Sequence, residues 1–427
     1  MDPMKENQPT ESLYPMNSHP SGKSRLSRIH DQRARDIVEG GLAVIKTNQC
    51  RDGGIVANER MWPICYVRDA YCGLRGLVAT GHFEELKSFI QWLDNNVTLH
   101  GFVPNAAPGG SNTYAHPNGN NWTPLPKVGI GDFSDTYACP EANQAVEVTA
   151  LYLLAARDYY QATRDLQTVS NVGRSLKYAM DIQLKHAVAN GYKLEFSGDE
   201  TELCGAVDMS PTGFDRDLTC YWSMTSIALC TASLDFYIKY LTMTGGNPAY
   251  YLNSQDSRTL NLHDELSRLK ESLEANYWRT DVAECPDGFH DWFRVKCNDS
   301  WPNARVVNFT LFPLFYGTPL KYPERAAKDV DAMKQFFNAR TQLLPLVAPG
   351  SGKSDGHDLG YLLWGLVMTG DNQRGAVYDA LVNGPTARCW GTYNEAYDVD
   401  GTPNASALRT FETGVNIAPW QSIGDWG

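Results

Sequence analysis

The sequence predicts an all-α fold, and three observations support this prediction. Apolar residues recur at helical spacing in about a dozen segments of the 427-residue chain. Almost no segment alternates apolar and polar residues, which is the pattern typical of a half-buried strand. The helical segments also alternate in character, because segments that are apolar on every side follow segments with one charged face. Helices of the first kind are expected inside the fold, and helices of the second kind outside them.

The expected helices follow a polar opening stretch, residues 1–27, which predicts a flexible tail. The first helix is expected over residues 30–48, where apolar residues recur at helical spacing. The later segments that are apolar on every side are expected to form inner helices: 68–80, 141–155, 221–236, 306–316 and 357–368. The segments with a charged face are expected to form outer helices: 83–97, 170–188, 263–277, 324–339 and 371–384. A last segment, 405–426, is aromatic and is expected to be irregular.

The alternation predicts how these helices are arranged. Six hairpins, each running from an outer to an inner helix, would close into an (α/α)6 barrel and use residues 28–427 as a single catalytic domain. The loops that precede the inner helices would then meet at one rim. The alternative is an irregular helical array or a solenoid, but no sequence repeat of fixed period supports a solenoid.

Composition and charge limit the possible partners. The net charge of −12 disfavours nucleic acid and anionic membrane surfaces, because both require a basic face. No apolar run approaches the roughly 20 residues that span a bilayer, and the opening stretch does not resemble a signal peptide. The chain is therefore expected to be cytoplasmic, while its oligomeric state is left open. Aromatic residues make up 11% of the chain, and their flat faces suit a small carbohydrate substrate.

Two of the predicted rim loops present a carboxylate in a polar or aromatic setting. Glu200 lies in the acidic turn 196–202, and Glu395 lies beside Trp390, Tyr393 and Tyr397. Cleavage of an acetal needs one group to protonate the leaving oxygen and another to activate water or attack from the far face of the sugar. Two carboxylates on opposite sides of a ring of helices can meet this demand. The alternative for the acidic turn is a solvated loop without a catalytic role.

The stretch Tyr66-Val67-Arg68-Asp69, followed by an apolar helix, resembles the first motif of the six-hairpin barrel glycosidases. This is the glucoamylase-like group, which includes trehalases and disaccharide phosphorylases. The resemblance implies that Arg68 and Asp69 bind hydroxyls of the terminal sugar. The turn around Glu200 is similar to the segment that holds the general acid in that group. Residues 394–401 resemble the segment that holds the general base, which implies this role for Glu395.

Competing interpretations exist for these residues. Glu412 is the alternative base, and Glu395 is preferred because Trp390, Tyr393 and Tyr397 could desolvate it and tune its pKa. Arg68 and Asp69 could instead form an ordinary ion pair at a helix start, where the helix dipole favours an aspartate.

Further candidates for sugar binding are the carboxylate next to Glu200 and several aromatic residues of the rim loops. The alternative role of the aromatic residues is core packing. The candidates are Trp62, Tyr66, Trp122, Asp199, Trp301, Trp390 and Tyr393. His290 and His357 each lie near an aspartate but form no set of metal ligands in the sequence, so neither a metal nor another cofactor is predicted. Residues 350–354 resemble a phosphate-binding loop, but Val347 stands where its first glycine would be, which favours a flexible turn.

These observations together predict an inverting, exo-acting glycoside hydrolase that releases a terminal monosaccharide from an oligosaccharide or a glycoside. The first alternative is a phosphorylase of the same fold, in which inorganic phosphate replaces water. The second alternative is a sugar-binding barrel without catalytic activity.

Overall fold

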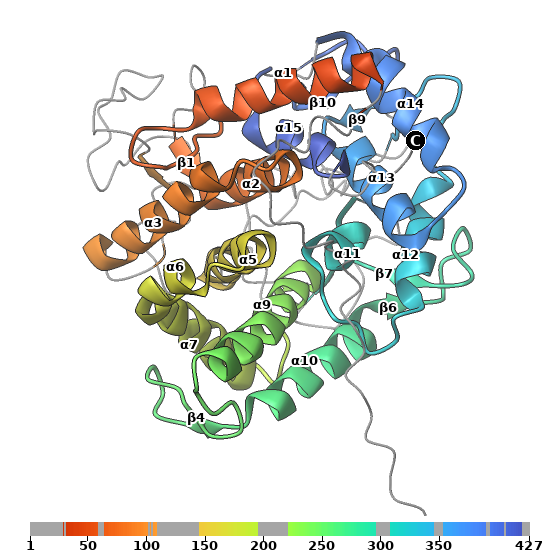
Figure 1. Ribbon diagram of the computed structural model, residues 1–427. Coiled ribbons are helices and arrows are strands. Elements are labelled where there is room, and N and C mark those ends of the chain that lie inside the picture. The colour runs from red at the N-terminus through yellow and green to blue at the C-terminus, as the bar shows by residue number, and fades with distance from the viewer. Residues whose placement is uncertain are drawn as a thin grey trace, which may run out of the picture.

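The computed structural model describes most of the chain outside the two ends and several loops. The described residues are 29, 31–58, 64–100, 103, 106–108, 145–194, 221–295, 308–345, 353–389, 393–404 and 407–420. Helices dominate these residues, as the sequence predicts (Figure 1). None of the described helices is both long and apolar enough to cross a membrane.

The outer helices carry the charged faces that the sequence indicates. They are α1 (Gln32–Asn48), α3 (Phe83–His100), α7 (Gly173–Ala189), α10 (Leu262–Tyr277), α12 (Arg325–Lys334) and α14 (Arg374–Asn383), with the short α6 (Leu166–Asn171) before α7. Each of these outer helices, α6 included, packs against at least one inner helix. This places them around the inner set in Figure 1.

The inner helices follow the outer ones in alternation along the chain. They are α2 (Val67–Thr80), α5 (Ala145–Thr163), α9 (Met224–Met243), α11 (Phe312–Tyr316), α13 (Asp358–Thr369) and α15 (Thr410–Ile417). Their contacts follow a cycle, because each inner helix packs against the next and α15 packs against α2 (Figure 1). Every residue of α2 is buried, as an inner position requires.

Local sequence explains where several helices begin and end. Asp31 caps α1, where its side chain accepts hydrogen bonds from the backbone N–H groups of Arg33 and Ala34. Ser223 caps α9 in the same way. At the other end, α2 stops at Gly81, whose φ of 79° lies in the left-handed region that favours glycine.

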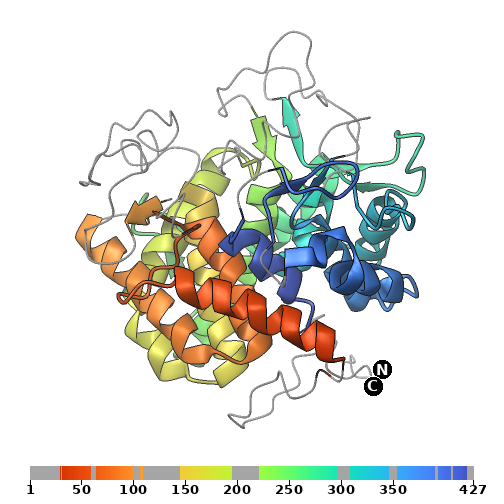
Figure 2. The same ribbon diagram turned by 90° about the horizontal axis from the view of Figure 1, so that it is seen from above.

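Short antiparallel strand pairs connect the loops, and the sequence shows no sign of them. The pairs are β1 (Ile64–Tyr66) with β2 (Ala106–Pro108), β3 (Tyr221–Ser223) with β8 (Phe293–Val295), β4 (Tyr251–Leu252) with β5 (Thr259–Leu260), β6 (Trp278–Arg279) with β7 (Phe289–His290), and β9 (Ser354–Asp355) with β10 (Ala396–Tyr397). Strands of two or three residues are too short to display a period of two. β1 leads directly into α2 and β3 into α9, and Figure 2 shows the green and teal arrows of β3 and β8 at one end of the helical body.

Three expectations about helices need correction. The segment 405–426 is not irregular throughout, because Thr410–Ile417 forms α15 and all eight of its residues are buried. The outer helix expected over 324–339 ends at Lys334, and beyond it the Asn338 side chain accepts hydrogen bonds from the backbone N–H groups of Arg340 and Thr341 in a turn. The inner helix expected up to residue 316 is a 3-10 turn, η3 (Asn308–Leu311), followed by α11, and another 3-10 turn, η4 (Pro385–Cys389), follows α14.

Two glycines allow α15 to lie against α2 at backbone distance. A Cβ atom added at Gly414 would stand 2.1 Å from the carbonyl oxygen of Cys72 and 2.6 Å from the Cα of Gly73. A Cβ atom at Gly73 would meet the Thr410 side chain at 2.5 Å. Side chains at these two positions would push the helices apart, so glycine is required there by the close approach.

The substitution Gly414→Ala is therefore expected to destabilise the protein by roughly 1–3 kcal/mol, the typical cost of overpacking a core. Gly375 in α14 is a suitable control, because a Cβ atom there would meet nothing within 4 Å. Gly375→Ala is expected to leave the stability unchanged or to raise it by up to about 1 kcal/mol. Chemical denaturation of both variants measures the difference, and equal stabilities would contradict the close packing of α15 on α2.

Candidate active site

The structure describes part of the predicted site. The predicted site residues within the described part are Tyr66, Arg68, Asp69, Tyr393, Glu395 and Glu412. Those that lie outside the described residues are Trp62, Trp122, Asp199, Glu200, Trp301 and Trp390, and the loop 350–352 lies outside as well. The role of Glu200 and its distance from Glu395 therefore remain predictions.

Arg68 and Asp69 occupy the first turn of α2 and are buried to the same extent, with 4% of each residue exposed. The two side chains contact the beginnings of different inner helices. Arg68 Nη1 lies 3.9 Å from Glu147 Oε1 at the start of α5, whereas Asp69 Oδ1 lies 3.6 Å from Nη2 of Arg409, the residue before α15. The two residues thus connect the beginnings of three inner helices, which an ion pair confined to the start of α2 would not do.

Arg409 lies among three carboxylates. Besides Asp69, its guanidinium contacts Glu412, with Nε 3.4 Å from Oε2, and Glu395, with Nη1 3.9 Å from Oε2. Glu412 is buried within α15, while the Glu395 side chain is 42% exposed. Of the two carboxylates proposed as base, Glu395 is thus the one that water can reach.

Backbone contacts fix the loop that carries Glu395. Its carbonyl oxygen accepts a hydrogen bond from the Gly356 N–H at 2.8 Å, and the adjacent strand β10 pairs with β9. The loop before α15 is therefore joined to the loop before α13. Tyr393 and Tyr397 are both fully buried. They do not enclose Glu395 as expected, because its side chain remains 42% exposed.

Glu412 has a pKa below its ordinary value although it is buried. Burial raises the pKa of this carboxyl, but the positive charge of Arg409 and the neighbouring His357 ring lower it by more. His357 Nδ1 lies 3.9 Å from Glu412 Oε1, which is an electrostatic contact and too long for a hydrogen bond. Glu412 is thus expected to be ionised at neutral pH and to balance the charge of Arg409.

This shift predicts how stability depends on pH. A depressed pKa in the folded state contributes stability that is complete above the unfolded-state value of about 4.3 and is lost as the pH falls through the folded-state pKa. Glu412→Gln is expected to cost about 1–3 kcal/mol at neutral pH and less in acid, where wild-type Glu412 becomes protonated too. Unfolding free energies of both proteins between pH 7 and 3 test this, and a difference that does not shrink in acid would contradict it.

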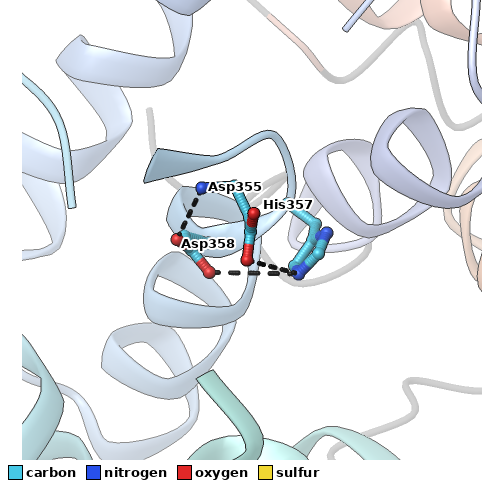
Figure 3. Close-up of side chains that lie close together, drawn as sticks. All are labelled: Asp355, His357 and Asp358. Carbon is cyan, nitrogen blue, oxygen red and sulfur yellow. Dashed lines mark hydrogen bonds and ion pairs between the residues drawn. The ribbon is translucent and has the colours of Figure 1, made fainter. Parts of the chain in front are cut away.

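Asp355, His357 and Asp358 form a further cluster beside these residues (Figure 3). His357 Nε2 lies 4.0 Å from an oxygen of Asp355 and 3.9 Å from an oxygen of Asp358, whose other oxygen accepts the Asp355 N–H at 3.0 Å. The His357 ring also packs edge-on against Phe411 of α15. The cluster therefore lies where α13 begins, next to the start of α15.

The three side chains of this cluster could offer ligands to a divalent cation. The sequence interpretation does not anticipate this grouping, in which the turn between β9 and α13 brings both aspartates near one ring nitrogen of His357. Ligand atoms around a transition metal bound at about 2.1 Å lie roughly 3.0–3.4 Å apart, so these side chains would have to move closer together. We assign them no metal.

Several residues of the site escape sequence reasoning. Glu147 left a signal, since it is a lone carboxylate in the apolar stretch that begins α5. The contact of Arg409 with Asp69 and that of His357 with Glu412 left none, because these pairs are distant in sequence and become neighbours only when the inner helices meet.

Comparison with known proteins establishes the fold. No protein-family model matches the chain, and neither does the sequence of any curated protein. Among solved structures, a GH63 mannosylglycerate hydrolase from Thermus thermophilus in complex with Tris and D-glycerate has a TM-score of 0.61 and 13% sequence identity, and the match covers 90% of this chain and 99% of that one. A glycosidase variant in complex with glucose has a TM-score of 0.58 and 12% identity, covering 93% and 98%. The wild-type form of a glycosidase has a TM-score of 0.57, with the same identity and coverage.

These neighbours share their fold with the chain over nearly its whole length. The resemblance to the six-hairpin glycosidases, which the sequence shows in only three short motifs, is thereby confirmed at the level of the fold.

Proposed function

We propose that the chain is an inverting, exo-acting glycoside hydrolase built on a single-domain (α/α)6 barrel, residues 28–427. The observation that carries this proposal is that Arg409, just before α15, lies 3.6 Å from Asp69 and 3.9 Å from the exposed carboxylate of Glu395, with Arg68 next to Asp69 at the start of α2. The fold shared with glycosidases supports it.

In the proposed reaction, a water molecule attacks the anomeric carbon of the terminal sugar while the bond to the leaving oxygen breaks. Glu395 takes the proton of this water, and Glu200 gives its proton to the leaving oxygen. Arg68 and Asp69 bind hydroxyls of the terminal ring and hold it between the two carboxylates. No cofactor takes part.

Glu412 is a poor candidate for the base, because its side chain is 2% exposed, whereas that of Glu395 is 42% exposed. The aromatic residues Trp62, Tyr66, Trp122, Trp301 and Trp390, together with Asp199, are proposed to contact the sugar. Tyr393 is buried and is proposed to support the wall of the site from behind.

The names of the structural neighbours guide the choice of test substrates. A suitable panel contains gluco-, manno- and rhamno-disaccharides together with mannosylglycerate. Each is incubated with the protein, with and without inorganic phosphate, and the products are separated by chromatography. Release of a free monosaccharide at the same rate in both conditions is expected for hydrolysis.

Two other outcomes would contradict the proposal and support a different function. Release that depends on phosphate and yields a sugar phosphate would indicate a phosphorylase. Binding of a sugar by calorimetry, without turnover of any member of the panel, would indicate a sugar-binding barrel.

A further inference from the structure

We propose that Arg409 is a positioning residue that fixes the distance between the general base and the sugar-binding carboxylate, and that buried Glu412 is its anchor. This inference rests on the proposed function, since it takes the roles of Glu395 and Asp69 from it. The contacts of Arg409 with Asp69 and Glu395 cannot be seen in the sequence pattern.

The first argument is the geometry of the guanidinium group. Each of its three nitrogens faces a different carboxylate: Nε lies 3.4 Å from Glu412, Nη2 lies 3.6 Å from Asp69, and Nη1 lies 3.9 Å from Glu395. The three carboxylates come from α15, from the first turn of α2 and from the loop after η4. One planar group therefore joins the first turn of α2 to two segments near the other end of the described chain.

The second argument is the difference in burial among the three carboxylates. The Glu412 and Asp69 side chains are 2% and 6% exposed, whereas that of Glu395 is 42% exposed. Glu412 belongs to a helix whose residues are all buried, so it holds the Nε end of the group in place. Glu395 is the exposed member of the three, and it is the one whose position the guanidinium can set.

The third argument is chemical. Arginine keeps its charge at any pH relevant to the protein and presents its donors in a rigid fork, whereas the ammonium group of lysine is a compact charge on a flexible stem. Asp69 and Glu395 would repel each other if no cation lay between them. Arg409 does not exchange protons with the substrate in this scheme, and it acts only through the carboxylates that it holds.

The test compares Arg409→Lys, Arg409→Met and Arg409→Ala with the wild type by steady-state kinetics on the best substrate of the panel. Arg409→Lys keeps the charge but loses the fork, and kcat is expected to fall on the order of 10-fold with a smaller change in KM. Arg409→Met and Arg409→Ala are each expected to lose on the order of 10²-fold, and in Arg409→Ala, which leaves room for the ion, millimolar guanidinium should restore part of kcat.

Arg325 provides a matched control on the outer helix α12. It pairs with the buried carboxylate of Glu274 and stacks over Trp278, but none of these residues belongs to the candidate site. Arg325→Ala is expected to keep the wild-type kcat and to show no response to guanidinium. An Arg409→Met variant with the wild-type kcat, or an Arg409→Ala variant that guanidinium does not restore, would overturn the positioning role.

A second measurement separates this inference from the proposed function. If the wild type releases no sugar from any substrate, the function fails, but the link can still be measured by unfolding. Arg409→Met, Glu412→Gln and the double variant then form a cycle. A double variant that loses less stability than the sum of the single losses supports the anchor, and strictly additive losses would overturn it.

Discussion

Replacing Glu395 by glutamine is expected to lower kcat/KM for glycoside hydrolysis on the order of 10²–10⁴-fold, because the amide cannot take the proton of the attacking water. The substitution keeps the size of the side chain, and the Glu395 side chain is 42% exposed, so we expect little change in folding stability. A lower kcat/KM would therefore not be explained by unfolding. The rate is measured with the preferred substrate of the panel, together with the unfolding midpoint of the variant.

Asp398 is the matched control for this experiment. Its side chain lies in the same loop and is also 42% exposed, but its carboxylate faces Lys353 and Asn404. Asp398→Asn is expected to keep a rate close to that of the wild type. If Glu395→Gln turns over at the wild-type rate, Glu395 is not the base, and Glu412 becomes the residue to test.

Replacing Asp158 by alanine is expected to destabilise the protein by about 3–5 kcal/mol, the usual cost of removing one partner from a buried ion pair. Asp158 of α5 is 1% exposed and accepts hydrogen bonds from Arg75 at 3.0 Å, from Arg157 at 2.9 Å and from the Tyr71 hydroxyl at 2.8 Å. Burial raises the pKa of this carboxyl, but the two arginines lower it by more, so it is ionised in the folded protein.

Asp158→Ala is expected to affect more than one ion pair, because the hydrogen-bonded network around Asp158 connects several inner helices. The Arg75 guanidinium of α2 stacks over Trp364 of α13, with 4.6 Å to the ring centroid, and Arg157 donates to the Tyr316 carbonyl of α11 at 2.6 Å. Without Asp158, two buried positive charges would lose the carboxylate that neutralises them. The loss is measured by denaturant unfolding.

An exposed ion pair on the neighbouring helix α9 serves as the control for the stability loss of Asp158→Ala. Asp235 and Lys239 of α9 lie 2.7 Å apart, with 29% and 57% of their side chains exposed. Asp235→Ala is expected to cost only about 0.3–0.5 kcal/mol. If Asp158→Ala and Asp235→Ala cost the same, the buried network does not hold the inner helices together.

The sequence predicts the helices well because their signals are local. Burial on every side makes most of α2, most of α13 and the first part of α9 apolar, and α9 ends shortly before Gly245. The inner helix α15 escapes prediction, since it buries Thr410, Thr413 and Asn416 among its apolar residues. Polar side chains inside a core depend on partners from other elements, as when Asn416 donates to the Gly356 carbonyl, and such partners are not visible in a sequence.

In the candidate site, too, some residues can be predicted from the sequence and others depend on the tertiary structure. Arg68 and Asp69 stand out in sequence because they precede an apolar helix in a motif of recognisable form. The partners that these residues meet, Glu147 and Arg409, depend on how the inner helices close on one another. The position of Glu395 also depends on the tertiary structure. Its loop is fixed by the pairing of β9 with β10, two strands that lie about 40 residues apart in the sequence.

The anomeric form of the sugar as it is first released tests the central claim most directly. A single displacement by water that Glu395 activates must invert the anomeric carbon. Proton NMR spectra recorded during the first turnovers of the best substrate are expected to show only the anomer opposite to that of the substrate, and the Glu395→Gln variant should not produce it. Release of the retained anomer would contradict the account, because it requires a covalent intermediate on a carboxylate about 5 Å from the acid.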